Sequence, residues 1–298
     1  MIKLVVRGSR WLWLLCGLCS VAALPAPAAA RVIRIVAAEN FYGDIAAQIA
    51  GPRASVQSVL RNPDADPHLF EADVATARAV ADADLVIYNG LSYDTWMTRL
   101  LAGTRSARRV VIEAATVAHA APGSNPHLWY DIGAMQAVAQ AISERLAEMD
   151  PAHRALYAQR AEQFRESLGP LEAEVRRVRA RYAGTAVAAT EPVADYLVAA
   201  LGLTMRERRF QLAILNATEP SARDTAAFEE ALRRRQVRVL IYNTQASGSA
   251  VRRLLDIARE SRVPIVGMSE TEPAGRSYQQ WMLGQLDALA RALSSPRP

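Results

Sequence analysis

Two histidines in this chain stand directly after a proline, in local sequences that match each other. His68 lies in the segment 64–71 and His127 in the segment 125–131, and each is followed by leucine and an aromatic residue. Proline fixes its own φ and biases the residue before it toward extended geometry, so each imidazole is presented from a stiff backbone. The chain holds only four histidines. This repeated setting predicts that His68 and His127 bind the same metal ion.

Two glutamates, Glu191 and Glu270, follow predicted strands in the second half of the chain. In open α/β sheets, ligands bind beyond the carboxyl ends of the strands. Neutral imidazole together with carboxylate suits zinc or manganese. We therefore predict one metal site in the cleft between the two halves, with His68, His127, Glu191 and Glu270 as ligands. Glu272, two residues after Glu270, is the alternative fourth ligand.

The other candidate residues have simpler interpretations. His119 and His153 lack the proline context and are expected at the surface or at helix caps. Asp66 and Asp131 flank the two histidines and are expected to support the loops. Glu191 also precedes a predicted helix, where a carboxylate complements the helix dipole.

The elements that must position these residues alternate between strand and helix. Apolar and β-branched runs predict strands at 32–38, 54–60, 84–88, 109–112, 186–190, 237–242 and 264–268. Helical spacing predicts helices at 41–49, 71–82, 94–102, 193–201, 220–235, 250–261 and 278–293. The segment 204–215 is expected to be extended or irregular. This rhythm predicts an α/β fold with mostly parallel sheets and helices on both faces.

A long helical pattern separates the two halves. It begins at Asp150-Pro151, with Asp as N-cap and Pro at the first helical position. One continuous helix over 151–181 would be about 46 Å long, and Pro170 should bend or break it. A coiled coil is the rival interpretation, but only about four heptads fit. We favour a connector that spans both lobes.

The first 30 residues have the features of a secretory signal. A basic start is followed by an apolar run from Trp11 to about Leu24 and a small-residue end at Ala30. The run is short of the ~20 apolar residues that a spanning helix needs. Cys16 and Cys19 both lie inside it, each preceded by leucine rather than a small residue. We expect a soluble periplasmic protein rather than a lipoprotein, and a mature chain without cysteine.

Composition is that of an ordinary soluble protein, with 51% hydrophobic and 22% charged residues. The formal net charge of +5 falls to +2 once Lys3, Arg7 and Arg10 leave with the signal, so nothing favours a nucleic-acid partner. Its 298 residues suffice for two cores. We expect a signal peptide at 1–30, an N-terminal α/β lobe at 31–150, a connecting helix at 151–181 and a C-terminal α/β lobe at 182–298.

These features resemble the zinc/manganese-binding receptors of bacterial ABC importers. The resemblance covers nearly all of the mature chain and rests on both Pro-His motifs, the long helix and the closing Ser277-Tyr-x-x-Trp-Met282. It implies two lobes joined by one rigid helix, with one metal ion between them. It also implies a loaded receptor that docks onto an inner-membrane permease driven by a cytoplasmic ATPase.

Carried over by motif, His68 and His127 match the first two ligands of that family. The third position is His in many zinc receptors and Glu in many manganese receptors, and here it is Glu191. The fourth is usually Asp, and here it is Glu270. The histidine-rich loop of many zinc receptors is absent, since 114–125 contains only His119. The ligand set is therefore compatible with zinc and with manganese.

The sequence therefore favours a periplasmic metal receptor, not an enzyme, which carries one zinc or manganese ion as its transported ligand. We expect a monomer that meets an ABC permease. One alternative is a secreted zinc hydrolase with three metal ligands and Glu270 as general base. Another is a metal chaperone or adhesin of the same fold.

Overall fold

The computed structural model describes residues 1–4, 31–64, 67–104, 106–246 and 248–296, with His68 described by its backbone alone. Val32–Pro298 forms one compact unit, and Met1–Arg31 is a separate one. Residues 5–30 of the expected signal peptide, including Cys16 and Cys19, lie outside this description. Within the described residues, no helix is both long and apolar enough to cross a membrane.

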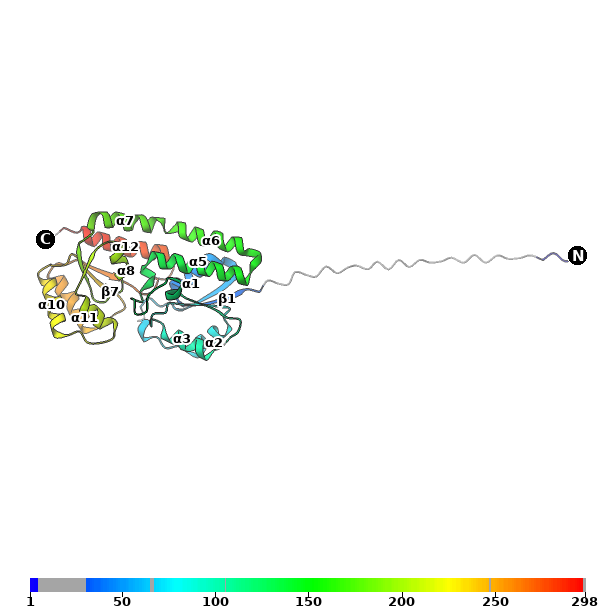
Figure 1. Ribbon diagram of the computed structural model, residues 1–298, viewed down its shortest axis with the longest axis horizontal. Helices are drawn as coiled ribbons and strands as arrows, with labels where there is room; N and C mark the ends of the chain where they lie inside the picture. Colours follow the sequence, from blue (N-terminus) through cyan, green and yellow to red (C-terminus); the bar gives the residue numbers. More distant parts are fainter. Residues whose placement is uncertain (5–30, 65–66, 105, 247, 297–298) are drawn as a thin grey trace. The chain divides into compact units, whose positions relative to one another are not determined.

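Two four-stranded sheets, each wholly parallel, form the framework of the compact unit (Figure 1). The first has the order β2-β1-β3-β4 and the second the order β6-β5-β7-β8. The strands are β1 (Ile33–Glu39), β2 (Ala54–Leu60), β3 (Leu85–Tyr88), β4 (Val110–Glu113), β5 (Ala186–Ala189), β6 (Thr204–Arg206), β7 (Leu240–Asn243) and β8 (Ile265–Met268). The predicted α/β class and the parallel sheets are confirmed.

Helices connect successive strands. They are α1 (Asn40–Ala50), α2 (Val74–Asp82), α3 (Thr95–Gly103), α4 (Ala114–Val117), α5 (Ile132–Met149), α6 (Arg154–Ser167), α7 (Gly169–Tyr182), α8 (Asp195–Ala200), α9 (Arg208–Leu215), α10 (Ala222–Arg233), α11 (Ser249–Glu260) and α12 (Tyr278–Ser294). Four 3₁₀ turns add to them, at η1 (Gly51–Arg53), η2 (Pro67–Leu69), η3 (Leu128–Tyr130) and η4 (Pro151–His153).

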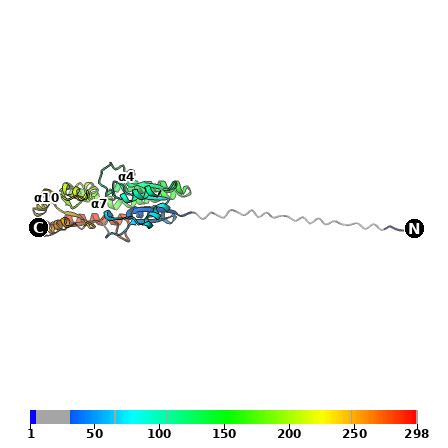
Figure 2. The ribbon, with the colours of Figure 1, turned by 90° about the horizontal axis from the view of Figure 1, so that it is seen from below.

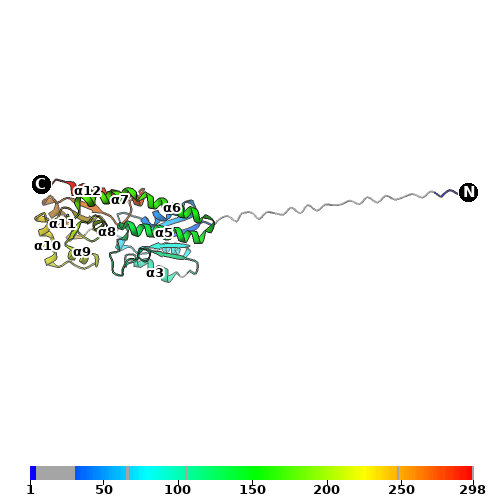
Figure 3. The same ribbon diagram turned by 45° about the horizontal axis from the view of Figure 1, so that its top comes forward.

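Alternate residues of the first sheet enter two different cores. Ile35 and Ile87 pack in the core that includes residues of α1 and α5. Val36 and Val86 pack in the core that includes residues of α2 and α3. Figure 3 shows α5 and α3 on opposite sides of this sheet. Because both faces are covered, β3 is apolar along its whole length and β1 is apolar from Ile35 to Ala38, rather than alternating.

The connector between the halves consists of two helices. A continuous helix over 151–181 is wrong, because α6 ends at Ser167 and α7 begins at Gly169. The break is at Leu168, whose N–H bonds to the carbonyl of Arg165 three residues back. The prediction that Pro170 breaks the helix is confirmed, since proline has no N–H and crowds the preceding turn. In Figure 1 the two helices follow one another along one edge of the molecule.

The segment 204–215 differs from the prediction of extended or irregular structure. Thr204–Arg206 is strand β6, but Arg208–Leu215 is helix α9. The helix buries Phe210, whose ring meets that of Phe228 edge to face at 5.1 Å between centroids. Phe210 and Ile214 are spaced one helical turn apart, which was the local sign of this helix.

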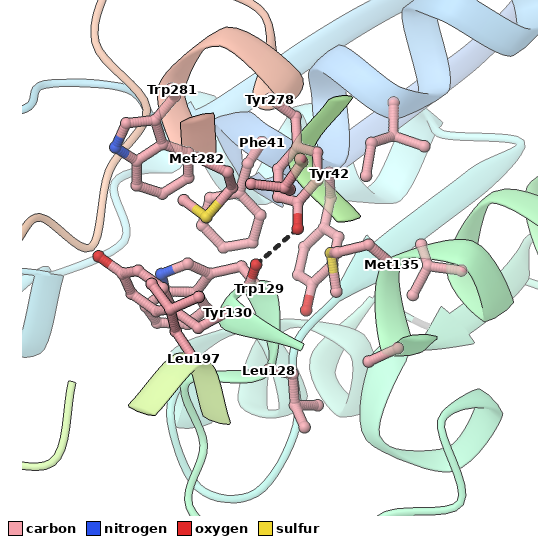
Figure 4. Close-up of a cluster of buried hydrophobic side chains, with 14 of the residues drawn as sticks. Phe41, Tyr42, Leu128, Trp129, Tyr130, Met135, Leu197, Tyr278, Trp281 and Met282 are labelled. Atoms are coloured by element: carbon pink, nitrogen blue, oxygen red, sulfur yellow. Dashed lines mark hydrogen bonds between the residues drawn. The ribbon is translucent and has the colours of Figure 1, made fainter. Parts of the chain in front are cut away.

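The end of the chain packs back on the first half. Tyr278 at the start of α12 donates its backbone N–H to Asp44 of α1 and its hydroxyl to the carbonyl of Trp129 (Figure 4). Asn40 bonds both the N–H and the carbonyl of Glu272. In Figure 2 the red α12 reaches the blue first half. The loop from 269 to 277 is therefore held against the carboxyl end of β1.

Candidate metal centre

His127 is fully buried, immediately before η3. Asn125 Oδ1 accepts from its backbone N–H at 2.9 Å and from its ring Nδ1 at 2.6 Å. This bond places the ring proton on Nδ1 and leaves the lone pair on Nε2. Among the described residues, Nε2 has no hydrogen-bond partner. A histidine whose second nitrogen is held by an oxygen acceptor is arranged as metal-binding histidines are.

Glu270 follows β8 and lies beside this nitrogen. Its Oε1 is 3.8 Å from His127 Nε2, and both side chains are at most 1% exposed. One cation about 2 Å from each donor atom fits between atoms at this separation. The two residues are 143 positions apart in the chain, and the fold brings them together.

Neutral donors orient the Glu270 carboxylate. Tyr93 donates its hydroxyl to Oε2 at 2.8 Å, and Asn243 donates its amide to Oε1. Gln245 Oε1 accepts the backbone N–H of Glu270 at 2.7 Å. Burial, and then the nearby Glu270 charge, raise the pKa of Tyr93 well above its usual value. Tyr93 therefore keeps its proton at neutral pH and donates it in the hydrogen bond to Glu270.

Glu272, the alternative fourth ligand, has a different environment. It is 5% exposed, and its backbone is held by Asn40 of α1. Burial, together with the charge of Asp44, raises the pKa of its carboxyl to about 9. At neutral pH it is therefore uncharged. The geometry favours Glu270, which is the one of the two found beside His127.

Glu191 follows β5 and is 6% exposed. The turn it begins is tied to the histidine loop by Asn125, whose Nδ2 donates to the carbonyl of Pro192 at 2.6 Å. Tyr196 of α8 donates its hydroxyl to the carbonyl of Asn125 at 2.8 Å. Asn125 thus fixes the His127 ring with one side-chain atom and the Glu191 turn with the other.

His68 lies in the 3₁₀ turn η2, and its side chain is outside the described part of the structure, as is Asp66. Within the described part, no group of three or more His, Cys, Asp or Glu side chains is gathered closely enough to hold a metal ion. The structure therefore pairs His127 with Glu270 and places Glu191 on the turn that Asn125 holds. The set of four ligands stays a prediction.

Three residues that were expected to lie outside the metal site, His119, His153 and Asp131, have other surroundings. His119 is exposed after α4, with a left-handed φ of 53°. His153 contacts Asp150 at 2.8 Å in a partly exposed pair. Asp131 caps α5 by accepting from Gly133 at 2.9 Å.

Three residues that hold Glu270 were not predicted from the sequence. Tyr93, Asn243 and Gln245 were not singled out, although each lies at or just after the carboxyl end of a strand. That position is the same signal that pointed to the two glutamates. Their side chains carry no local pattern that separates them from ordinary loop residues.

Comparisons with known proteins agree with this architecture. The family model described as zinc-uptake complex component A, periplasmic, matches residues 35–292. The solved structure of the periplasmic zinc-binding protein TroA from Treponema pallidum has a TM-score of 0.76 at 21% identity, covering 89% of this chain and 100% of that one. A structure of the solute-binding protein FpvC from Pseudomonas aeruginosa with Mn²⁺ has a TM-score of 0.72 at 24% identity, covering 88% and 98%.

A curated relative, the manganese-binding lipoprotein MntA of Halalkalibacterium halodurans, is 31% identical over 145 residues, 47% of each protein. The matched region thus spans about half the length of that relative. The match of the family model is much longer and takes in both sheets and the closing helix. The chain belongs to the family of zinc-uptake complex component A, periplasmic.

Proposed function

We propose that this chain is an extracytoplasmic receptor that captures one zinc or manganese ion and delivers it to an ABC permease in the inner membrane. The observation that carries the proposal is the buried pair of His127 Nε2 and Glu270 Oε1, 3.8 Å apart. A lone pair and an oriented carboxylate that face each other away from water form half of a four-ligand site. His68 and Glu191 would complete it.

The choice between the two metals rests on two opposed effects. Two carboxylates among four ligands favour manganese over a site richer in histidine, whereas zinc outbinds manganese at the same ligands. Relatives named for each metal, MntA for manganese and TroA for zinc, match this chain. We propose one transported ion per protein, with both metals as ligands in solution.

The proposed organisation is that of a solute-binding protein, not an enzyme. Four protein ligands leave no coordination position for the water that a zinc hydrolase needs. We propose a signal peptide at 1–30 that is removed on export, lobes at 31–150 and 182–298, and a connector at 151–181. The mature protein would be a periplasmic monomer.

Metal binding by the isolated protein tests this function. Protein stripped of metal is titrated with Zn²⁺ and with Mn²⁺ against a competing chelator, and the bound metal is measured after gel filtration. We expect one ion per chain and a higher melting temperature with metal, because the ion binds the folded state. Protein that retains no metal and shows no shift in melting temperature would refute the proposal.

A further inference from the structure

Two acidic side chains lie buried together at the carboxyl end of the first sheet. Glu39 is the last residue of β1 and Asp94 immediately precedes α3, and they are 2% and 1% exposed. Burial, and then the nearby Asp94, raise the pKa of Glu39 well above its usual value. Burial raises the pKa of Asp94 to about 6. Of the two acids, Asp94 therefore ionises more readily at neutral pH, and Glu39 holds its proton more tightly than an exposed glutamate does.

Asp94 holds the turn that follows β3. Its two carboxylate oxygens accept from the backbone N–H groups of Asn89 at 2.5 Å and Gly90 at 2.9 Å. Gly90 has a φ of 82°, a left-handed conformation that glycine adopts readily. The carboxylate therefore fixes the backbone of both residues at this turn.

From this turn, one route leads to His127. Asn89 is fully buried, and its Nδ2 donates to the carbonyl of Pro126 at 2.9 Å. Its Oδ1 accepts the hydroxyl of Tyr42 at 2.7 Å. Pro126 directly precedes His127. The bond from the Asn89 amide therefore fixes the position of the backbone that carries the imidazole.

A second route leads to Glu270. Tyr93 directly precedes Asp94, and its hydroxyl donates to Glu270 Oε2 at 2.8 Å. Its ring also packs edge to face on the His127 ring, at 6.2 Å between centroids. The turn that Asp94 holds thus touches the paired metal-site residues from the side of the first lobe.

We propose that Asp94 and Asn89 are positioning residues for metal capture, which set His127 through Pro126 and Glu270 through Tyr93. This inference rests on the proposed function. Neither residue is expected to touch the metal. They hold the turn that brings a lone pair and a carboxylate to the same point before the ion arrives.

The acid pair suits this task for a physical reason. A carboxylate is the short side chain that can accept two backbone N–H bonds with two separate oxygens, and charge-assisted bonds of this kind are strong. A second buried charge beside it would be costly. The raised pKa of Glu39 favours its neutral form, which avoids that second charge.

The test compares variants by their affinity for Zn²⁺ at pH 7.5. Asp94→Asn replaces one acceptor oxygen with a donor, and Asn89→Ala removes the bond to Pro126. We expect each to weaken binding at least about tenfold, as loss of residues that orient metal ligands does. Asp94 and Asn89 both act on His127 through Pro126. The affinity of the double variant should therefore be close to that of whichever single variant binds Zn²⁺ less tightly.

Two variants serve as matched controls. Glu39→Gln places a neutral side chain of the same shape beside Asp94 and should bind within about threefold of wild type. Glu229→Gln neutralises a buried acid on α10, 7% exposed, and should lower stability without changing affinity. The absorption spectrum of bound Co²⁺ adds a readout of ligand geometry, which should change in Asp94→Asn and Asn89→Ala but not in the controls.

The outcomes separate cleanly. If Asp94→Asn and Asn89→Ala lower the melting temperature but keep wild-type affinity and the Co²⁺ spectrum, the residues are merely structural and the inference is overturned. If Asp94→Asn does not fold, Asn89→Ala decides alone: a tenfold loss supports the inference and unchanged affinity overturns it. A wild-type protein that binds no Zn²⁺ refutes the proposed function itself, before any variant is compared.

Discussion

Two buried glutamates of the second half, Glu229 and Glu270, are surrounded in opposite ways. Arg233 and Arg253 both bond the Glu229 carboxylate, and the side-chain bond from Arg253 is the main cause that lowers its pKa to about 2. Neutral groups, the Tyr93 hydroxyl and the Asn243 amide, donate to Glu270, and the His127 lone pair lies opposite. Arginines balance the charge of the first carboxylate, whereas the printed hydrogen bonds to the second come from neutral donors, which suits a cation from outside.

Glu229 therefore serves the stability of the fold, whereas Glu270 serves the proposed metal site. A carboxylate that already has cationic partners strengthens the fold and gains little from an added ion. An oriented carboxylate with neutral donors costs stability in the empty protein and recovers it when a divalent ion binds. Substitutions at the metal site and at the ion pair should affect affinity and stability differently, and the largest expected effect is on metal affinity.

His127→Ala should break the site most completely. It removes the imidazole whose Nε2 faces Glu270, and we expect Zn²⁺ affinity to fall more than about a hundredfold, beyond the loss caused by residues that only orient ligands. His153→Ala is the matched control, because His153 pairs with Asp150 at the surface. Competition titration measures both. Equal affinities for the two variants would remove His127 from the site.

Glu270→Gln should weaken metal binding next most strongly. The amide keeps the shape of the side chain but removes the charge that faces the ion, so we expect a loss of at least about tenfold. Glu272→Gln should leave affinity near wild type, because the Glu272 carboxyl is already neutral at pH 7. Isothermal titration of both variants decides between them. A larger loss in Glu272→Gln would reverse the assignment of the fourth ligand.

Glu229→Gln should lower the stability of the empty protein by about 1 to 3 kcal/mol at pH 7, a range discounted for the exposure of both arginines. The pKa of Glu229 is lowered in the folded state, so its stabilisation is present above about pH 4.5 and is lost as pH falls toward 2. Urea unfolding at several pH values measures this. A stability difference that does not shrink below pH 4 would contradict the ion-pair explanation.

Glu272→Gln should have the smallest effect on stability at about pH 4 and below, under about 0.5 kcal/mol, because the carboxyl is then largely protonated in both the folded and the unfolded state. Because burial raises the pKa of Glu272 to about 9, the wild-type protein loses stability as pH rises from about 4.5 through 9. The variant lacks this loss and should become the more stable of the two at pH 9. Thermal melts across this range test the sign; a variant that is less stable at pH 9 would show that the carboxyl is not neutral when buried.

Much of the fold could be predicted from local pattern. The β-branched run at 32–38 and the four-residue spacing of Phe41, Ile45 and Ile49 correspond to β1 and α1. Helix α9 was missed because its eight residues span only about two turns, too few for a helical period to stand out from an apolar run. The break at Leu168 lies two residues before the proline that was expected to cause it. Short elements and exact boundaries depend on packing that periodicity does not report.

The sequence by itself determined the alternation of strands and helices, the stiff presentation of His127 after Pro126 and the placement of acids after strands, since each depends on neighbours within a few residues. Only the tertiary structure decided that Asn125 joins the loop of His127 to the turn after β5, that Tyr93 reaches Glu270 across 177 positions, and that Asn40 of α1 holds the backbone of Glu272. The reason is physical: hydrogen bonds and desolvation act over a few ångströms in space. Residues far apart in the chain come within that range only when the two sheets and the closing helix have packed.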